Sequence, residues 1–282
     1  MSGARPGVLG VCADDVGLVE GVAETVLALA ERGRLSAASC VTNAPGWPRA
    51  AAVVAAAPAS LELGLHFNLS EGMPRSAELR AHWPTLPGVA HLLSLAHLRG
   101  LPVGAVRAEF AAQVEAFIAA LGRAPAFVDG HQHVHALPGV RGVVLDAIAT
   151  WPTLPAVRNT GQLLGPGAGF KRAVIEASGG RALQRELVAR AIPHNRALLG
   201  AYDFIAANYG ALMRRWLVAS PRDGGLVFCH PCATAVDGSG DPIASARRRE
   251  AAYLGSDAFA ADLDAAGLTV GAPWAKRSSS DD

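Results

Sequence analysis

Short apolar runs alternate with longer amphipathic segments along almost the whole chain, and this alternation limits the fold more than any other feature. Strands that alternate with helices form a parallel sheet, which is either doubly wound or closed into a barrel. We expect strands over residues 7–13, 35–42, 61–68, 156–158, 225–229 and 268–270, with a further strand beginning at 127. We expect helices over 18–33, through the alanine run near 50–57, and over 103–121, 139–150, 182–191, 209–219 and 244–266.

The stretch from about 70 to 102 interrupts this pattern. It is rich in Pro, Leu and His and has no clean period, so we interpret it as a long insertion that carries short helices. Insertions of this length often cover an active site.

Composition limits the size and the partners of the protein. A chain of 282 residues with 51% hydrophobic content can bury a large core, and we expect one domain over 1–275 and a disordered polar tail over 276–282. The net charge of +1 gives no sign of nucleic-acid binding. Arg247, Arg248 and Arg249 form a short basic run, which we interpret as a solvated helix face or a few anion contacts.

The cysteines and the apolar segments bear on location. Cys12 and Cys40 lie in apolar runs typical of buried strands, as free thiols do in a reducing compartment. Cys229 and Cys232 have the C-x-x-C spacing of redox proteins, but they follow a late strand, and no second pair completes a structural zinc site. We find no secretory signal and no membrane-length apolar run, and we expect a cytoplasmic protein without a transmembrane segment. The oligomeric state stays open, with a homodimer as one alternative.

Reactive side chains follow the expected strands at the point where each strand ends. Asp14 and Asp15 follow the first strand, Asn43 follows the second, and His66 lies near the end of the third; Asp129, His131 and His230 end later strands. In parallel α/β folds, the carboxyl ends of the strands meet on one face, where sites are assembled. We therefore expect these side chains to converge.

The segment from Asp129 to His135 is the densest group of such residues. In an extended backbone, positions 129, 131, 133 and 135 would point to one side, which would bring three imidazoles and a carboxylate together. Such clustering is typical of metal or catalytic sites. A pH-responsive or merely hydrogen-bonded histidine cluster is the alternative.

Each residue also has a purely structural interpretation. Asp14 and Asp15 could only cap a helix, and His66 could be a satisfied buried histidine. Two carboxylates and at least two imidazoles on one rim nevertheless favour a metal pocket. Nucleotide chemistry is disfavoured, because no glycine-rich loop has the dinucleotide-binding or P-loop spacing.

Four motifs in order resemble the signatures of YdjC-like carbohydrate deacetylases. They are Ala13-Asp14-Asp15-Val16-Gly17, Gly64-Leu65-His66-Phe67-Asn68-Leu69, Asp129-Gly130-His131-Gln132-His133-Val134-His135 and Cys229-His230-Pro231. The resemblance runs from about residue 8 to about 272. It implies an irregular (β/α) barrel, similar to a TIM barrel, that hydrolyses the N-acetyl group of amino sugars with one divalent metal ion.

The resemblance also implies a role for individual residues. Asp15, His66 and His131 would be the metal ligands, Asp14 the carboxylate that activates water, and His230 the acid near the leaving amine. Val16, Cys12 and Val19 stand where the family more often has Phe, Asn and Ser. These departures concern packing and the pocket wall, so they bear on the substrate more than on the chemistry.

Amide hydrolysis needs an activated nucleophile, a sink for the oxyanion and a proton for the departing nitrogen, and this set of residues can supply all three. Two imidazoles and a carboxylate suit zinc, cobalt or nickel better than magnesium, which remains an alternative. Asn43, Asn68, His133 and Arg158 are candidates for binding an acetylated sugar or glycoconjugate; Arg158 could instead orient Asp14, and His133 and His135 could be structural. A non-catalytic metal- or sugar-binding module, or a hydrolase of another amide or an ester, are the alternative functions.

Overall fold

The computed structural model describes residues 5–167 and 169–274, and the tail expected at 276–282 lies outside this part. Every strand belongs to one parallel sheet. The strands are β1 (Gly7–Val16), β2 (Ala37–Cys40), β3 (Glu62–Phe67), β4 (Phe127–Gly130), β5 (Ala156–Val157), β6 (Ala197–Leu199), β7 (Asp223–Cys229) and β8 (Leu268–Val270).

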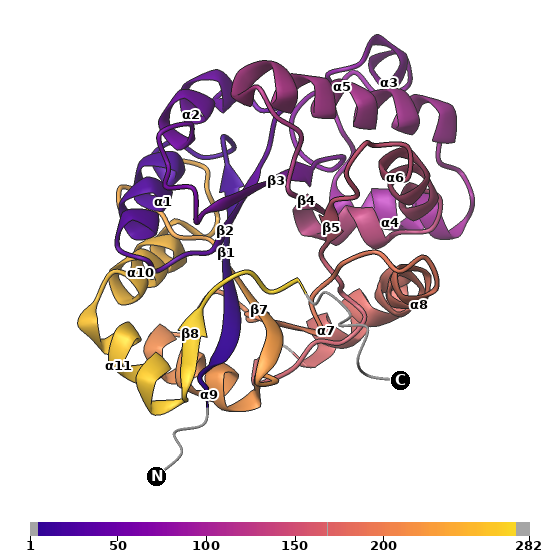
Figure 1. Cartoon of the computed structure of the whole chain (residues 1–282). Helices are drawn as coiled ribbons and strands as arrows, with labels where there is room; N and C mark the ends of the chain where they lie inside the picture. Colours follow the sequence, from indigo (N-terminus) through magenta and orange to yellow (C-terminus); the bar gives the residue numbers. More distant parts are fainter. Residues whose placement is uncertain (1–4, 168, 275–282) are drawn as a thin grey trace.

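The sheet curls into an irregular barrel with the order β5-β4-β3-β2-β1-β7-β6, and β8 pairs with the first residues of β1. Isolated parallel bridges, Val157 to His194 and Leu163 to Leu198, connect the segments at its two ends. Helices surround the sheet, and β1 runs through the centre of the view in Figure 1. The expected (β/α) barrel is therefore confirmed.

The helices occupy the segments between the strands, as the alternation predicts. They are α1 (Val22–Glu31), α2 (Trp47–Val54), α3 (Ala77–His82), α4 (Val89–His97), α5 (Val103–Leu121), α6 (Val140–Ile148), α7 (Gly169–Ile175), α8 (Arg181–Ala189), α9 (Tyr209–Ala219), α10 (Ala244–Leu254) and α11 (Asp257–Ala265). The longest, α5, ends at Gly122, whose φ of 68° is the left-handed conformation that glycine adopts at low cost.

The barrel interior is filled by small and large apolar side chains from different strands. One buried cluster joins Cys12, Ala37, Phe127, Leu198, Leu226 and Phe228, which come from β1, β2, β4, β6 and β7. Two larger clusters pack the helices onto the outside of the sheet. This close packing of the barrel interior restricts the positions of the polar side chains at the carboxyl ends of the strands.

The insertion predicted at 70–102 carries the short helices α3 and α4, and its apolar residues pack with β3, β4, α5 and α6. Ser76 caps α3, since its side chain accepts a hydrogen bond from the backbone N of Leu79. From α4, Val89, Ala90 and Leu93 face the large pocket at the carboxyl ends of the strands.

Two differences between the structure and the expected elements lie after residue 190. The helix expected over 244–266 is two helices, α10 and α11, because Ser256 adopts an extended conformation between them. The strand β6 was not predicted, because its three apolar residues are too few to form a recognisable pattern.

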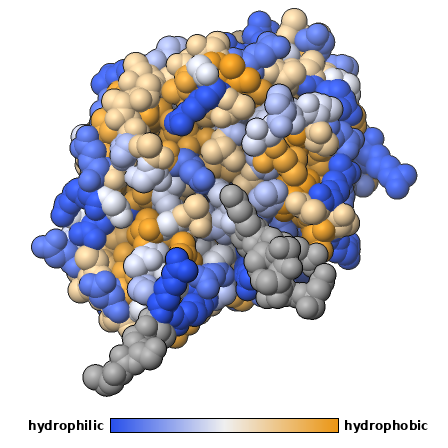
Figure 2. Space-filling view, viewed as in Figure 1, coloured by the Kyte–Doolittle hydropathy of each residue, from blue (hydrophilic) through white to orange (hydrophobic). Residues whose placement is uncertain are grey.

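The outer surface is mixed in character. On the face shown in Figure 2, hydrophilic side chains gather along the outer edge, with hydrophobic side chains between them. Within the described residues, no helix combines the length and the apolar character that crossing a bilayer requires.

Candidate active site and metal centre

Asp14 and Asp15 both line the large pocket, although neighbouring residues in a regular strand point to opposite faces. An irregularity makes this possible. The pairing of β1 with β2 shifts between Ala13 and Val16, and Asp15 has a φ of 69°. Aspartate tolerates this left-handed conformation better than most residues do. The irregularity therefore delivers two consecutive carboxylates to one site.

The extended conformation expected from Asp129 to His135 is wrong after Gly130. Residues His131–Ala136 form a tight 3₁₀ turn, in which Gln132 and His133 have φ values of 52° and 61°. Gly130 permits the turn, because a Cβ there would lie 2.8 Å from the backbone N of His135. The histidines consequently separate: His131 faces Asp15, whereas the Nε2 of buried His135 donates to the carbonyl of Arg158.

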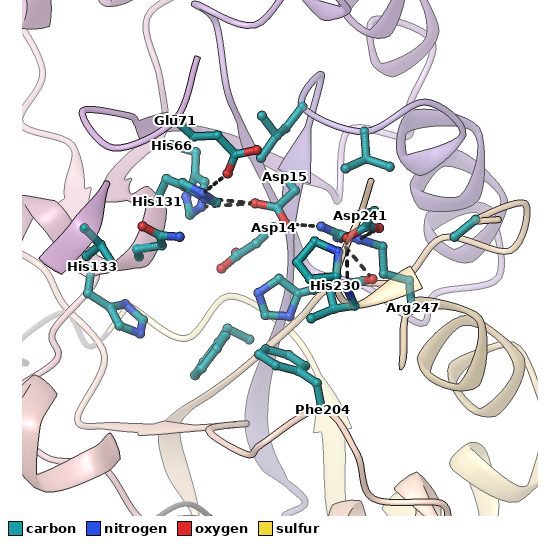
Figure 3. A pocket seen from close by; sticks show the side chains of 18 of the residues that line it. Asp14, Asp15, His66, Glu71, His131, His133, Phe204, His230, Asp241 and Arg247 are labelled. Carbon is teal, nitrogen blue, oxygen red and sulfur yellow. Dashed lines mark hydrogen bonds and ion pairs between the residues drawn. The ribbon is translucent and has the colours of Figure 1, made fainter. Parts of the chain in front are cut away.

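Asp15, His66 and His131 come together as a group that can hold one metal ion. The Oδ1 of Asp15 lies 3.1 Å from Nδ1 of His131 and 3.7 Å from Nε2 of His66, and all three side chains are almost fully buried. They meet from β1, β3 and the turn after β4 (Figure 3). One carboxylate and two imidazoles at this spacing fit the donor set of a divalent transition metal.

Asp129 orients His66 by bonding Nδ1, the ring nitrogen that faces away from Asp15. Its Oδ1 lies 2.6 Å from Nδ1 of His66 and also accepts a hydrogen bond from Ser39. Since an ionised carboxylate can only accept, the proton of His66 is on Nδ1, and Nε2 faces the ligand group. Burial opposes ionisation of Asp129, but the charge of Arg158 and the contacts with His66 and Ser39 hold its pKa below the usual range.

Two further residues, neither of them predicted from the sequence as part of the site, contact the ligand group. Arg247 is buried and bonds the Oδ2 of Asp15 at 2.8 Å, while its Nε bonds Asp241. The solvated helix face expected for this residue is therefore wrong. The spacing held a signal: Arg247, Glu250, Ala251 and Leu254 form a buried stripe at helical intervals.

Glu71 is the second unassigned residue. Its Oε2 lies 3.1 Å from Nε2 of His131, and its side chain remains 54% exposed. Glu71 follows the motif that carries His66 by only a few residues, but nothing in its local pattern distinguishes it from a solvated glutamate. Only the folded arrangement brings it to a histidine 60 residues away.

The charges in this cluster determine its protonation. Burial opposes the charged form of His131, but hydrogen bonds to Asp15 and Glu71 raise its pKa to about 9. Burial likewise opposes ionisation of Asp15, yet the bond from His131 and the charges of His131, Arg247 and His230 hold its pKa well below the usual range. The site thus favours a positive charge between carboxylates, which is the electrostatic condition for binding a cation.

Asp14 is held by Arg158 rather than by the ligand group. The guanidinium of Arg158 donates to both oxygens of Asp14, at 2.6 and 2.7 Å, and lies 2.6 Å from Oδ2 of Asp129. Arg158 is fully buried and does not line the pocket, so its side chain acts through these carboxylates. Asp14 itself lines the pocket, where a substrate can reach it.

His230 lies at the end of β7 and lines the same pocket. Its ring packs edge-on against Phe204 and Phe228, with ring centroids 5.2 and 5.7 Å apart. Its backbone N donates to buried Glu250, which also accepts a hydrogen bond from Tyr202 at 2.6 Å. Burial raises the pKa of Glu250 to about 7, in spite of these two bonds.

The pocket has a volume of about 1240 Å³ and continues well beyond the ligand group. Its apolar lining includes Leu93 of α4, Ile175 of α7, Val19, Val236 and Ile243. In Figure 3, His133 lies on the opposite side of the ligand group from Arg247 and Asp241. His133 also lines the pocket and packs edge-on against Phe228.

The two asparagines expected to bind substrate have other contacts. Buried Asn68 bonds the backbone of Ser70 and Glu71, and its Nδ2 also bonds the side chain of Asn43. Asn43 in turn donates to the carbonyl of Met73. Neither asparagine is among the residues that line the pocket. In this structure, both side chains support the loop after β3.

The cysteines show no pairing. Cys12 and Cys40 are buried free thiols, as expected, and Cys229 and Cys232 are buried free thiols too. Burial raises the pKa of Cys229 well above its ordinary value, which keeps this thiol protonated.

Comparisons of the sequence with known proteins find carbohydrate deacetylases among its relatives. A carbohydrate deacetylase of Mus musculus is 37% identical over 165 residues, which cover 54% of this chain and 51% of that protein. A chitooligosaccharide deacetylase of Escherichia fergusonii is 28% identical over 141 residues, 48% of this chain and 52% of that protein. The matches thus span about half the length of these curated relatives.

A structural match and a family-model match each cover more of the chain than these sequence matches do. The crystal structure of a candidate cellobiose-phosphate cleavage protein from Enterococcus faecalis superimposes with a TM-score of 0.72 over 95% of this chain and 97% of that one. At 18% sequence identity, this similarity supports the fold alone. The family model described as YdjC-like protein matches residues 8–265. The chain therefore belongs to the YdjC-like family.

Proposed function

We propose that the protein is a metal-dependent hydrolase that removes the N-acetyl group from an acetylated amino sugar or sugar conjugate. The observation that carries the proposal is the convergence of Asp14, Asp15, His66, His131 and His230 on one pocket. The names of the mouse and Escherichia relatives, which are deacetylases of carbohydrates and chitooligosaccharides, support the class of substrate.

Asp15, His66 and His131 would hold the metal ion, because their donor atoms face one another and their other polar atoms are already engaged. When bound, a divalent ion would supply a Lewis acid for the acetyl carbonyl and would lower the pKa of water. Two imidazoles and one carboxylate favour zinc, cobalt or nickel, with magnesium as the alternative.

Asp14 would take the proton of the attacking water. Arg158 holds both of its oxygens, which restricts its position, but a carboxylate oxygen has lone pairs beyond the one that Arg158 engages. A base at a defined position contributes more to the rate than a mobile one, because less reorganisation is needed at the moment of proton transfer.

His230 would donate a proton to the departing amine nitrogen. Phe204 and Phe228 restrict its ring, and the bond from its backbone N to Glu250 restricts its main chain. An imidazole titrates near neutral pH, so it can give a proton to the amine and recover one from solvent. A base and an acid in one pocket argue against a non-catalytic binding module.

The proposal is tested by stripping the purified protein with a chelator, adding back zinc, cobalt, nickel or magnesium, and measuring acetate release from N-acetylated sugars. We expect release to need a metal and to return with at least one of them. Failure to cleave any N-acetylated sugar with any of these ions would overturn the proposed reaction. If the protein cleaves acetyl esters and no N-acetylated sugar, it is an esterase and the proposed N-deacetylation is wrong.

The variant His131→Ala tests the ligand set directly. It removes one of three donors and leaves Asp15 next to an empty volume, so we expect zinc affinity to fall at least 100-fold, as measured by competition with a chelating dye. The exposed His91 on α4 supplies the control His91→Ala, which should bind zinc like the wild type. Wild-type affinity in His131→Ala would refute the proposed ligands.

A further inference from the structure

The three proposed metal ligands each have a second polar atom held by another residue. Asp129 holds His66 and Arg247 holds Asp15, and both of these supporting residues are in the protein interior. Glu71 holds His131 and differs from the other two, because about half of its side chain is exposed. It also lies at the start of the insertion, before α3.

The contact with Glu71 determines which nitrogen of His131 is available. An ionised carboxylate can only accept a hydrogen bond, so the contact of 3.1 Å places a proton on Nε2 of His131. Nδ1 faces Oδ1 of Asp15, also at 3.1 Å, so this nitrogen too is protonated without a metal ion, and an ion held by Asp15 would replace that proton. The two imidazoles therefore present opposite ring nitrogens: Nε2 of His66 and Nδ1 of His131.

Asn68 holds the backbone of Glu71 in place. Its Oδ1 accepts hydrogen bonds from the backbone N of Ser70 and Glu71, at 3.0 and 3.1 Å, and its Nδ2 donates to the carbonyl of Glu71 at 2.8 Å. Asn68 is itself bonded through its backbone to the side chain of Gln113 on α5. The backbone that carries Glu71 is thus fixed to the barrel, although its side chain is exposed.

The far end of the loop is held by the same helix. Glu109 on α5 is fully buried and accepts hydrogen bonds from the backbone N of Arg75 and Ser76, at 2.9 and 2.7 Å. It also accepts one from Gln113. Two neighbouring turns of α5 therefore hold both ends of residues 68–76, which we call the strap.

We propose that Glu71 is a positioning residue that keeps the proton of His131 on Nε2 and so directs Nδ1 to the metal, and that the strap connects the insertion to the metal site through this contact. The proposal rests on the ligand set of the proposed function. A carboxylate that bonds the second nitrogen of a ligating histidine fixes the tautomer and the ring orientation and makes the imidazole a stronger donor.

Direct ligation by Glu71 is the competing explanation. The group of side chains whose donor atoms can surround one ion contains Asp15, His66 and His131, and Glu71 is not in it. The geometry therefore favours an indirect role through His131.

The experiment measures zinc affinity by competition with a chelating dye for Glu71→Ala, Glu71→Gln and the control Glu78→Ala, which changes an exposed glutamate on α3. We expect Glu71→Ala to weaken zinc binding about 10- to 100-fold, the usual effect of losing such a partner. Glu71→Gln retains an acceptor and should recover part of the loss, whereas Glu78→Ala should bind like the wild type. Equal affinity in Glu71→Ala and the wild type would overturn the proposal.

Two further measurements separate positioning from ligation and from folding. In ¹¹³Cd-loaded, ¹⁵N-histidine-labelled wild type, we expect coupling of the metal to Nδ1 of His131; coupling to Nε2 would overturn the proposal. In the double variant Asn68→Ala/Glu71→Ala, the loss should not exceed that of Glu71→Ala, because Asn68 acts through Glu71. If the loss of zinc affinity in the double variant equals the sum of the losses in Asn68→Ala and Glu71→Ala, the role of the strap is contradicted.

The zinc titration does not depend on turnover, so the two proposals can fail separately. A wild type that binds zinc but releases no acetate would overturn the proposed reaction and leave the role of Glu71 standing. A wild type that binds no zinc would overturn both.

Discussion

At the scale of single residues, Asp14 and Asp15 are neighbours in the chain but have separate partners. Asp15 faces His131 and Arg247, whereas Asp14 is bonded on both oxygens by Arg158. The left-handed conformation of Asp15 produces this division, and Gln132 and His133 have the same conformation across the site. Such conformations cost free energy and persist where the surrounding structure enforces them, often at functional sites.

Asp14→Asn tests the division between the two carboxylates. The amide cannot accept a proton from water, so we expect kcat for acetate release to fall about 100-fold or more. Zinc affinity should stay within a few-fold of the wild type, because Asp14 is not among the proposed ligands. The control is Asp264→Asn on the exposed face of α11, which should leave both quantities unchanged. Loss of zinc binding in Asp14→Asn would show that Asp14 is itself a ligand.

At the scale of elements, α5 covers the sheet and also holds both ends of the strap. It carries Gln113 and Glu109, which are fully buried and bond the strap between β3 and α3. A buried carboxylate is costly unless hydrogen bonds compensate for its lost hydration, and the backbone N–H groups of the strap supply these bonds. The conformation of the insertion is therefore coupled to a helix on the outside of the barrel.

Glu109→Ala removes one end of this attachment. The N–H groups of Arg75 and Ser76 would lose their acceptor, so we expect the free energy of unfolding to fall by about 2–3 kcal/mol. Urea denaturation measures this change, with Glu115→Ala on the exposed side of the same helix as the control. We expect the control to change the free energy by less than about 0.5 kcal/mol. A similar loss in both variants would contradict the role of Glu109 in holding the strap.

At the scale of the whole molecule, buried charges connect the site to segments that are distant in the sequence. Arg158 and Arg247 neutralise carboxylates from β1 and β4, and α10 carries both Arg247 and Glu250. Glu250 bonds the backbone of His230 and the hydroxyl of Tyr202, so this helix supports two sides of the pocket. Pairing of this kind makes each member costly to remove alone.

Glu250 predicts how stability depends on pH. Burial raises its pKa from 4.5 to about 7 in the folded protein, so the folded chain binds this proton more tightly than the unfolded chain does. The free energy of unfolding should therefore fall as pH rises from about 4.5 to 7, by at most about 3 kcal/mol from this group. Glu250→Gln cannot titrate and should flatten this part of the profile.

Urea titrations of the metal-free protein between pH 5 and 6.5 measure the effect. His131 acts in a higher window, because its pKa rises from 6.5 to about 9, so its contribution is present below 6.5 and is lost towards pH 9. An exposed Glu115→Gln variant should keep the wild-type slope. The same slope in Glu250→Gln would contradict the assignment to Glu250.

The sequence predicted the barrel and most of the residues that the structure brings to its rim. Alternating strands and helices are local patterns, and parallel strands necessarily deliver their last residues to one edge, so the convergence of Asp14, Asp15, His66, His131 and His230 followed from local information. The resemblance to a family then implied a separate role for each of them. The insertion was also predictable, because the lack of a period is itself a local property.

Contacts between distant residues, and backbone conformations that break a regular pattern, were decided only by the tertiary structure. Asp15 meets Arg247 across 232 positions of sequence, and His131 meets Glu71 across 60. The local pattern around Glu71 is equally compatible with a solvated side chain, and the buried stripe on α10 indicates that Arg247 is buried but not which residue it meets. The turn after Gly130 likewise overrode the alternation that predicted all the histidines of that segment on one side. Local periodicity specifies which residues can reach the site, whereas packing specifies which atoms meet there.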